Sequence, residues 1–314
     1  MNKDEAIKIV KANSLEFKKL PTKFRKDKEV SSEAIKQYGC LLQFADETLK
    51  NDKAFVLKTM KKYGYALQFV SSNLKRDKEV VMTAVTQNGY ALEFADKDLQ
   101  FDKEIIFAAI NQNGYSLQFV NKNLRRNKEI VLTAIKNYCF ALKYADESLK
   151  KDKEVILEAL KQYGYALKYA DKSLKKDRDI VLTALKKNVF SLVYADDSLK
   201  KEKEFIIKAL KICSFGTFLE YVDDKLKKDK DVVLEAVKQW GVSLQFAAEE
   251  FKKDKKIVYE AVKQYGEALR FAHSSLKKDK KFILSLLKIS DYSVEFIDEK
   301  LKKDPDIILN STLN

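Results

Sequence analysis

The sequence predicts an all-α solenoid, a superhelix of tandem 25-residue repeats that each contribute two helices. Three observations predict it. An acidic residue or its amide returns every 25 positions along most of the chain. All eight glycines fall at one position of that repeat, and only two prolines occur. Hydrophobic residues make up 46% of the chain, which is ample for a folded protein. Because a 25-residue unit cannot bury its apolar faces alone, successive units must stack.

The register of the repeat is set by the residue that opens each unit. These positions are Asp27, Asp52, Asp77, Asp102, Asn127, Asp152, Asp177, Glu202, Asp229, Asp254, Asp279 and Asp304. The step is 25 residues except before Asp229, where two extra residues fall within 211–216. Eleven tandem repeats therefore occupy 27–303. Residues 1–26 predict a degenerate N-terminal capping repeat, and 304–314 a truncated C-terminal repeat.

Local signals place two helices in each repeat. The opening Asp is typical of an N-cap, whose carboxylate accepts a bond from a free amide of the first turn. Apolar residues then recur at helical spacing, as in Val155, Leu157, Ala159 and Leu160. The glycine predicts the end of the first helix and a positive φ. A shorter second helix follows, for example over 166–170, and a leucine anchors the return loop. The glycines are Gly39, Gly64, Gly89, Gly114, Gly164, Gly216, Gly241 and Gly266.

The Gly-Tyr-Ala-Leu core of the repeat stands at 64–67, 89–92 and 164–167. It resembles a family of uncharacterised short helical repeats, a domain of unknown function found in bacteria, protists and large DNA viruses. The resemblance covers nearly the whole chain. It implies the helical repeat fold and nothing about chemistry.

The net charge of +14 favours acidic partners. Only six of the 61 basic residues are Arg, whereas specific base reading favours the planar guanidinium group. The excess charge is also spread over the whole chain, with no basic tail. We therefore expect another protein or peptide as the partner, acidic ones included, and nucleic acid as the alternative. The arginines are Arg25, Arg76, Arg125, Arg126, Arg178 and Arg270.

Cysteine and histidine usage argues against metal and catalytic sites. Cys40, Cys139 and Cys213 are odd in number, far apart and lack CxxC spacing, so neither a disulfide framework nor a zinc site is indicated. His273 is the one histidine and stands where other repeats carry Asp, so a solvated surface position is expected. We expect no metal, no cofactor and no enzymatic activity, because a Ser/His/Asp or Cys/His arrangement cannot recur.

The sequence also bears on location. No apolar stretch of 18 residues occurs, so no membrane span is expected. The N-terminal residues MNKDEAIKIVKAN lack an apolar run long enough for a signal peptide. A cytoplasmic protein without a cleaved signal is therefore expected.

One variable position stands directly before the glycine, and it is a candidate binding surface. We call it the helix-end row: Tyr38, Tyr63, Asn88, Asn113, Tyr138, Tyr163, Asn188, Trp240 and Tyr265. One variable residue on a constant frame is how helical repeats read RNA bases, by stacking or by amide bonding. Tyr and Asn are also ordinary residues at helix ends, so both interpretations stand.

The residue after the glycine is aromatic in a second set of positions. In a Schellman-type helix ending this residue packs on the residue five places earlier, which is apolar in each case. We therefore expect a structural role. The set, which we call the post-glycine row, is Tyr65, Tyr90, Tyr115, Phe140, Tyr165 and Phe190.

Paired lysines in the predicted return loops form a candidate polyanion ridge. Stacked repeats would bring them into line, where they could meet phosphates electrostatically. Acidic neighbours in most repeats favour a solvated edge of mixed charge instead. The lysines are Lys150, Lys151, Lys175, Lys176, Lys200, Lys201, Lys227, Lys228, Lys252, Lys253, Lys277 and Lys278, with Lys302 and Lys303 continuing the pattern.

The array is expected to be irregular at one point. Val189 replaces the glycine in one repeat, and a β-branched residue is unsuited to positive φ, so that first helix should end differently. The next repeat contains the insertion. We expect an altered stacking angle between 185 and 222, filled by Phe215 and Phe218, although a surface bulge would leave the superhelix regular.

These observations predict a protein-interaction scaffold without catalytic activity. A nucleic-acid-binding solenoid that uses the lysine ridge is the alternative. A self-assembling structural element comes third, because Asp304 opens a repeat that needs a cover. Affinity that falls steeply with salt would separate the second class from the first.

Overall fold

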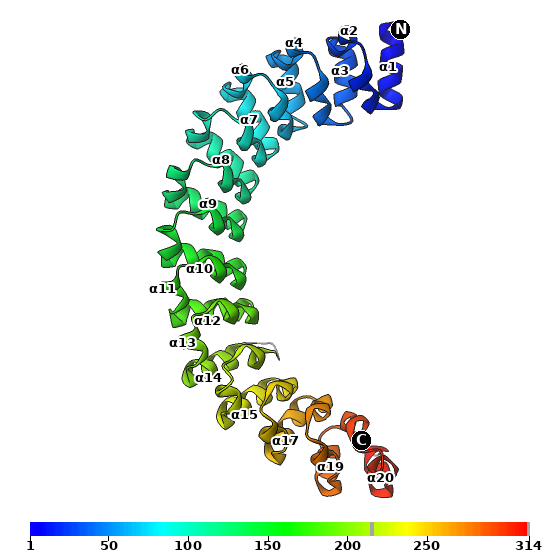
Figure 1. Cartoon of the computed structure of the whole chain (residues 1–314), viewed down its shortest axis with the longest axis vertical. Helices are drawn as coiled ribbons and strands as arrows, with labels where there is room; N and C mark the ends of the chain where they lie inside the picture. The colour runs from blue at the N-terminus through cyan, green and yellow to red at the C-terminus, as the bar shows by residue number, and fades with distance from the viewer. Residues whose placement is uncertain (214–216, 313–314) are drawn as a thin grey trace. The chain divides into compact units, whose positions relative to one another are not determined.

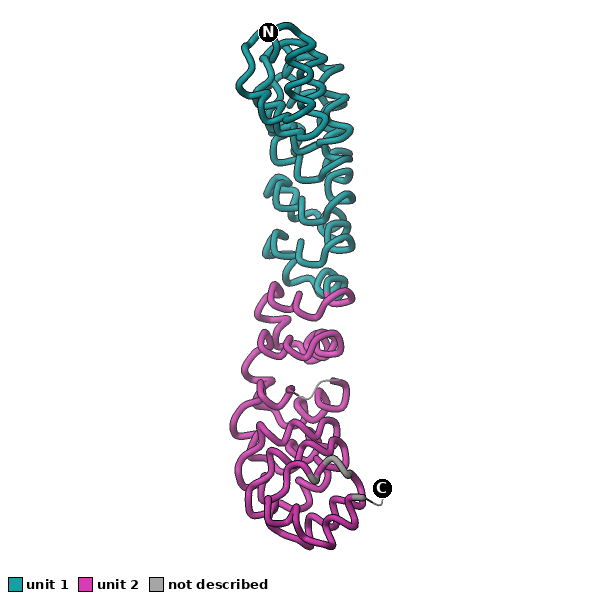
Figure 2. Tube along the Cα trace, turned by 90° about the vertical axis from the view of Figure 1, so that its right-hand side faces the viewer, with its two compact units in different colours: residues 1–159 teal, residues 160–314 magenta. Residues whose placement is uncertain are grey.

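Every regular element in the described part of the chain is helical, which confirms the all-α repeat solenoid. The computed structural model describes residues 1–213 and 217–312, and no strand occurs among them. The chain divides into two compact units, residues 1–159 and 160–314 (Figure 2). Both units are built from the same repeat, so one description of the repeat serves for each.

Each repeat holds three helical segments, where the sequence predicts two. The first helices are α1 (Lys3–Ala12), α3 (Lys28–Ile35), α5 (Lys53–Met60), α7 (Lys78–Gln87), α8 (Lys103–Gln112), α9 (Lys128–Asn137), α10 (Lys153–Gln162), α12 (Arg178–Lys187), α14 (Lys203–Ile212), α15 (Lys230–Gln239), α17 (Lys255–Gln264), α19 (Lys280–Leu287) and α20 (Pro305–Thr312). The second helices are 3₁₀ helices: η1 (Ser14–Lys19), η2 (Gly39–Phe44), η3 (Gly64–Phe69), η4 (Gly89–Phe94), η6 (Gly114–Phe119), η8 (Cys139–Tyr144), η10 (Gly164–Tyr169), η11 (Val189–Tyr194), η12 (Phe218–Tyr221), η14 (Gly241–Phe246), η15 (Gly266–Phe271) and η16 (Asp291–Phe296). The third helices are short: α2 (Thr22–Arg25), α4 (Glu47–Lys50), α6 (Ser72–Lys75), η5 (Leu99–Phe101), η7 (Lys122–Arg126), η9 (Leu149–Lys151), α11 (Lys172–Lys175), α13 (Asp197–Lys200), η13 (Leu226–Lys228), α16 (Glu249–Lys252), α18 (Ser274–Lys277) and η17 (Leu301–Lys303).

Acidic side chains start both the first and the third helices. Asp27 Oδ1 accepts hydrogen bonds from the backbone amides of Glu29, at 2.9 Å, and Val30, at 3.1 Å. Asp171 Oδ1 accepts from the amide of Ser173, at 2.9 Å, and from its hydroxyl, at 2.7 Å. The first amides of a helix have no partner within it, so each such cap favours a helix start. The predicted return loop is therefore a short helix with its own cap.

The third helices also join successive repeats through the backbone. The amide of Asp46 donates to the carbonyl of Arg25, and the amide of Ser71 donates to the carbonyl of Lys50, both at 3.1 Å. In the N-terminal unit α4 and α6 lie along one side of the row formed by α3, α5 and α7 (Figure 1). A regular strip of short helices therefore accompanies the long ones.

The core lies between successive first helices. In α8, Ile105, Ile106, Ala109 and Ile110 are fully buried. This helix contacts both α7 and α9, so its apolar stripe must be wide enough for two neighbours. Fully burying one such aliphatic side chain stabilises the fold by about 1.5–3 kcal/mol.

The buried stripe differs by one residue from the predicted one. In α10, Ile156 is fully buried along with Val155, Ala159 and Leu160, whereas Leu157 is 36% exposed. Leu157 lies about 100° farther round the helix than Ile156. It therefore lies at the edge of the stripe that neighbouring helices cover, where the side chain is only partly buried.

The prediction of positive φ at the glycines is wrong. None of the described glycines, Gly64, Gly89 and Gly164 among them, has a positive φ. The first helix ends because the residue before the glycine becomes extended, as at Asn88 with φ −148° and ψ 108°. The glycine then opens the second helix, so a left-handed residue is not needed.

The glycine is required by the close approach of the next repeat. A Cβ atom on Gly64 would lie 2.2 Å from the carbonyl oxygen of Ala84, and one on Gly164 would lie 2.2 Å from that of Ala184. The amide of Gly64 also donates to Gln87 Oε1 at 2.6 Å. Backbone contact at this range leaves no room for any side chain.

The expectation that the first helix before Val189 ends differently is wrong. α12 stops at Lys187, and Asn188 is extended with φ −158° and ψ 116°, as at the glycine-containing repeats. Val189 then opens η11 (Val189–Tyr194) without a positive φ, so the argument from positive φ does not apply. Val189 itself is buried, with 1% of its surface exposed.

The insertion falls between α14 and η12. Phe215 lies outside the described residues, and Phe218, which begins η12, is 1% exposed. α14 and α15 on either side have the usual length of ten residues. The altered stacking angle between 185 and 222 stays a prediction.

A ladder of ion pairs links the start of most first helices to the start of the next. Lys53 Nζ lies 2.8 Å from carboxylate oxygens of both Asp77 and Glu79. Lys128 Nζ lies 2.8 Å from Asp152 and 2.7 Å from Glu154. The same arrangement recurs at Lys3, Lys78, Lys203 and Lys280. The acidic residue two places after the N-cap therefore binds the preceding repeat as well as suiting its own helix dipole.

These contacts shift the pKa values of the paired groups in opposite directions. The hydrogen bond from Lys128 lowers the pKa of Asp152 below its ordinary 3.8, against the raising effect of partial burial. Hydrogen bonds to Asp152 and Glu154 raise the pKa of Lys128 above 10.5. In the third-helix caps, bonds from Ser148 and Arg126 lower the pKa of Asp146 to about 2.

We predict that Gly64→Ala destabilises the protein by about 1–3 kcal/mol, because the added Cβ overpacks against the Ala84 carbonyl. Urea denaturation followed by circular dichroism measures the change. The control is Lys61→Ala, an exposed position one turn earlier, which should stay within about 0.5 kcal/mol of the parent. Equal midpoints for the two variants would show that the close approach is not what excludes a side chain.

We predict that stability falls as the pH drops from about 4 to about 2. The carboxylates have lowered pKa values in the fold, so they stabilise it above their unfolded pKa and lose that effect as they protonate. The raised pKa of Lys128 adds a loss above about pH 10.5. Thermal midpoints between pH 2 and pH 7 measure the acid limb.

Lys128→Met should reduce the fall in the thermal midpoint between pH 4 and pH 2, because Asp152 loses the cation that lowers its pKa. Lys103→Met is the matched control: the next repeat opens with the uncharged Asn127. An acid limb unchanged in Lys128→Met would contradict the assignment.

Candidate functional site

The helix-end row lies where each first helix gives way to the second. Its members precede the second helices with extended backbone, as at Tyr138 with φ −157° and ψ 105°. Tyr38 is 53% exposed, and Tyr138, Tyr163 and Tyr265 are about 40% exposed. The other members of the row are half-buried. The predicted row is therefore a partly exposed border in each compact unit.

The asparagines of the row cap the second helices. Asn88 Oδ1 accepts from the amide of Tyr90 at 3.0 Å, and Asn188 Oδ1 accepts from that of Phe190 at 2.9 Å. Asn113 makes the same bond to Tyr115. The capping oxygen is engaged, which leaves the Nδ2 group as the part of the amide that could meet a ligand.

The tyrosines of the row contact neighbouring repeats. Tyr63 donates its hydroxyl to the carbonyl of Lys36 at 2.9 Å, at the end of α3. Tyr163 accepts from Asn188 Nδ2 at 3.1 Å. Row members in successive repeats are thus close enough to touch one ligand together.

Shallow pockets recur at this position in three places. One is lined by Tyr63 and Asn88, a second by Tyr163 and Asn188, and a third by Tyr265 together with Ser290. Each brings a row residue together with its counterpart in the next repeat. Lysines at the ends of first helices complete the lining: Lys62, Lys187 and Lys263.

The rings of the post-glycine row pack between repeats; their packing on the residue five places earlier stays a prediction. At five of the six positions the aromatic ring meets the last aromatic ring of the next second helix, edge to face. The pairs and ring-centre distances are Tyr65–Phe94 (4.9 Å), Tyr90–Phe119 (5.9 Å), Tyr115–Tyr144 (5.0 Å), Tyr165–Tyr194 (4.7 Å) and Phe190–Tyr221 (5.7 Å). Without a left-handed residue the chain does not fold back as in a Schellman ending, so the ring reaches forward. Such pairs contribute about 0.5–1.5 kcal/mol each beyond area burial.

The first lysine of each predicted pair is engaged within its own repeat. Lys175 Nζ donates to the carbonyl of Lys168 at 2.8 Å, and Lys277 Nζ donates to that of Arg270 at 2.7 Å. Burial lowers the pKa of both ammonium groups. These lysines cap the end of the second helix, where carbonyl groups lack partners. Others in the set, Lys150, Lys227 and Lys252, pair with a carboxylate three residues earlier.

The second lysine of each pair extends into solvent. Lys176 Nζ lies 3.9 Å from Asp196 of the next repeat, and Lys278 lies 3.9 Å from Asp298. Exposed pairs of this kind contribute little to stability. The proposed ridge therefore offers one lysine per repeat to an anion where the sequence suggested two. The remaining exposed members are Lys151, Lys201, Lys228 and Lys253.

The residues considered for chemistry have local structural partners. His273 caps α18, where Nδ1 accepts from the amide of Ser275 at 3.2 Å. Burial raises the pKa of the Cys213 thiol to about 12, which makes it a poor nucleophile. No group of three or more His, Cys, Asp or Glu residues in the described chain is placed to hold a metal ion. Among those same residues, none of the helices is long and apolar enough to cross a membrane.

Sequence reasoning missed the glutamine two residues before the glycine. Gln87 Oε1 accepts a hydrogen bond from the backbone amide of Gly64 in the preceding repeat, at 2.6 Å. Gln112 Oε1 accepts the equivalent bond from Gly89, also at 2.6 Å. Recurrence of Gln at 37, 87, 112, 162, 239 and 264 was the available signal. This recurrence does not identify a hydrogen-bond partner 23 residues away, because that contact depends on how the repeats stack.

Comparison with protein families agrees with this repeat. The model described as Domain of unknown function (DUF4116) matches residues 2–50, 27–75, 52–100, 77–125, 102–150, 127–175, 152–200, 177–227, 202–252 and 229–277. The chain belongs to the DUF4116 family. Each match spans two consecutive repeats and overlaps the next match by one, so the DUF4116 model describes a repeat together with its neighbour. No curated protein and no solved structure matches the chain.

We predict that Asn188→Ala destabilises this DUF4116 array by about 1 kcal/mol, because the amide of Phe190 loses its cap. Asn188→Asp is the matched variant, since it keeps an acceptor oxygen but loses the Nδ2 bond to Tyr163. Thermal denaturation of the two variants separates capping from the contact to Tyr163. Equal loss in both would contradict the capping role.

Proposed function

We propose that this protein is a binding scaffold, without a catalytic step, that holds an extended acidic segment of a partner protein along the helix-end row. The observation that carries the proposal is the recurrence of one pocket. Equivalent pockets form at Tyr63, Tyr163 and Tyr265, each shared by two consecutive repeats. A surface that repeats at the period of the fold suits a ligand that is itself extended.

The chemistry of the row favours an acidic peptide. Exposed aromatic rings provide flat apolar contact at low entropic cost, and aromatic residues dominate protein-binding hot spots. Lysines at the ends of the first helices flank the pockets, where carboxylates would meet them; Lys62, Lys187 and Lys263 are examples. The net charge of +14 would speed the encounter with an acidic partner.

Nucleic acid is supported less well. The first lysine of each ridge pair is already bound, either to a backbone carbonyl, as at Lys175 and Lys277, or to a carboxylate, as at Lys150. The asparagine oxygens of the row cap helices, so they are not free to accept from a base edge. Arginine, the residue best suited to read bases, is scarce.

A reducing compartment such as the cytoplasm is part of the proposal. All three cysteines are thiols, with Cys40 exposed and Cys139 and Cys213 buried. Cysteine thiols are typical of proteins that work where disulfides do not persist.

We predict that peptides selected from a random displayed library will be rich in Asp and Glu and will contain apolar residues. The quadruple variant Tyr38→Ser, Tyr138→Ser, Tyr163→Ser and Tyr265→Ser should bind them at least about tenfold more weakly. Fluorescence anisotropy measures the affinities, and circular dichroism checks the fold.

The matched control is Phe101→Ser, which removes an equally exposed ring at the end of η5, away from the row. It should leave affinity unchanged. Selection of no peptide, or equal loss in both proteins, would count against the row. Tight binding of single-stranded RNA with a steep salt dependence would favour the nucleic-acid alternative.

A further inference from the structure

One repeat lacks a large side chain that every other repeat has at the same place. Ser32 of α3 stands at the sixth position of its repeat, counted from Asp27. In the ten repeats that follow, this position is always a large apolar or aromatic residue. The residues are Leu57, Met82, Phe107, Leu132, Leu157, Leu182, Ile207, Leu234, Tyr259 and Leu284.

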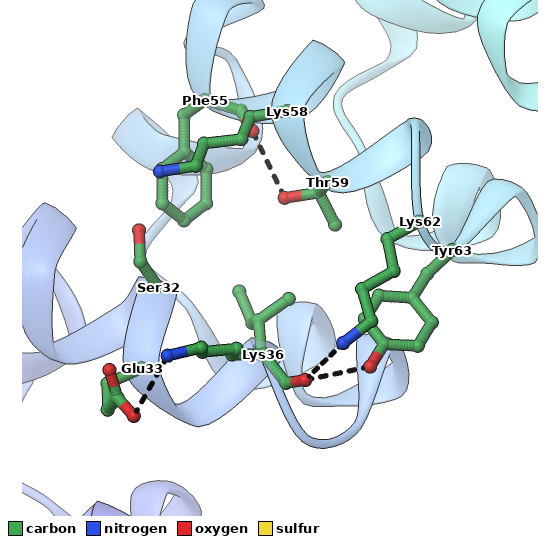
Figure 3. A pocket seen from close by; sticks show the side chains of 9 residues that line it. Ser32, Glu33, Lys36, Phe55, Lys58, Thr59, Lys62 and Tyr63 are labelled. Atoms are coloured by element: carbon green, nitrogen blue, oxygen red, sulfur yellow. Dashed lines mark hydrogen bonds and ion pairs between the residues drawn. The ribbon is translucent and has the colours of Figure 1, made fainter.

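A pocket lies where that side chain is missing. It opens between α3 and α5, has a volume of about 280 Å³, and is shown in Figure 3. Its apolar wall comes from Ile35 and Phe55, which are 4% and 7% exposed. Thr59 is also buried, and its hydroxyl is bound to the carbonyl of Phe55 at 3.0 Å. The hydroxyl of Ser32 takes the place of the larger side chains of the other repeats.

The rim of the pocket is positively charged. Lys36, Lys58 and Lys62 surround the opening, against the one carboxylate of Glu33 (Figure 3). Lys36 Nζ lies 3.8 Å from Glu33 Oε1, and Lys62 Nζ donates to the carbonyl of Lys36 at 2.9 Å. Lys58 is exposed on α5. Three cations and one anion leave an excess of positive charge around an apolar wall.

The volume limits what the pocket can hold. Sites for drug-sized ligands or cofactors measure about 300–1,000 Å³. A space of about 280 Å³ that is open to solvent suits one side chain. Because the other repeats fill the equivalent place with Leu, Met, Phe, Ile or Tyr, a side chain of that size and polarity is the natural occupant.

The pocket is continuous with the helix-end row. Lys62 and Tyr63 line both this pocket and the neighbouring row pocket that includes Asn88. Tyr63 is held in place by the bond from its hydroxyl to the carbonyl of Lys36. A segment that follows the row would therefore pass the opening at Ser32.

We propose that the pocket at Ser32 receives one bulky apolar side chain from an acidic segment of a partner protein, and so fixes the register of that segment on the array. This inference rests on the proposed function of the helix-end row. The apolar wall at Phe55 contacts the side chain, and the lysines of the rim contact acidic residues on either side of it.

The test uses two synthetic peptides with blocked ends and an N-terminal fluorescent label: Glu-Glu-Glu-Phe-Glu-Glu-Glu and the same peptide with Ala in place of Phe. Fluorescence anisotropy with the full chain measures both affinities. We expect the Phe peptide to bind at least about tenfold more tightly, because burying the ring is worth that factor. Equal affinities, or no binding of either peptide, would overturn the proposal.

Ser32→Leu is the decisive variant, because the other repeats show that the fold accepts Leu at this place. It should abolish the preference for the Phe peptide and leave the thermal midpoint unchanged or higher. Lys58→Glu provides a second variant, which should weaken both peptides, and Lys103→Glu is its matched control on α8. A preference that survives in Ser32→Leu would refute the pocket.

The two proposals fail in different ways. If the two peptides bind with equal affinity and the quadruple tyrosine variant no longer binds them, binding at the helix-end row is supported and the role of the pocket is refuted. If the tyrosine variant binds as the parent does and Ser32→Leu loses the Phe preference, the pocket stands and the row is refuted.

Discussion

The close approach of the repeat glycine to the backbone of the next repeat, seen at Gly64, Gly89, Gly114, Gly164 and Gly241, is the constraint on which the stacking depends. At Gly64 the backbone lies so near the Ala84 carbonyl that a Cβ atom would be 2.2 Å from it, and the glycine amide binds Gln87. This contact brings the end of one first helix against the next, and the wide apolar stripes between first helices can then close. Each repeat consequently depends on its successor, as the overlapping two-repeat matches of the family model also indicate.

Polar groups are arranged so that this stacking leaves few of them unsatisfied. Asp27 caps its own helix and also binds Lys3 of the preceding repeat. Lys175 satisfies a carbonyl at the end of its second helix instead of reaching into solvent. Part of the charged content of 34% is therefore structural. The net charge of the chain overstates how much of its surface is available to an anion.

What remains for a partner is the border between first and second helices. Here the aromatic and amide residues vary from repeat to repeat while the backbone stays constant, and the pockets at Tyr63, Tyr163 and Tyr265 recur. The repeat with Ser32 differs from the others because a small side chain stands where they have a large one, which leaves a pocket. In a protein built from nearly identical units, such a departure gives one place along the array a distinct ligand preference.

The sequence by itself determined the helical class, the 25-residue period, the N-caps and the position of the helix-end row, because these depend on residues close along the chain. The tertiary structure alone decided why the glycines are needed, since Ala84 lies 20 residues beyond Gly64. It likewise showed that the rings of Tyr65 and Phe94 pack against each other, and that Val189 opens a second helix without a positive φ. Local pattern specifies which helix forms, whereas contacts between repeats depend on a stacking geometry that no single repeat contains.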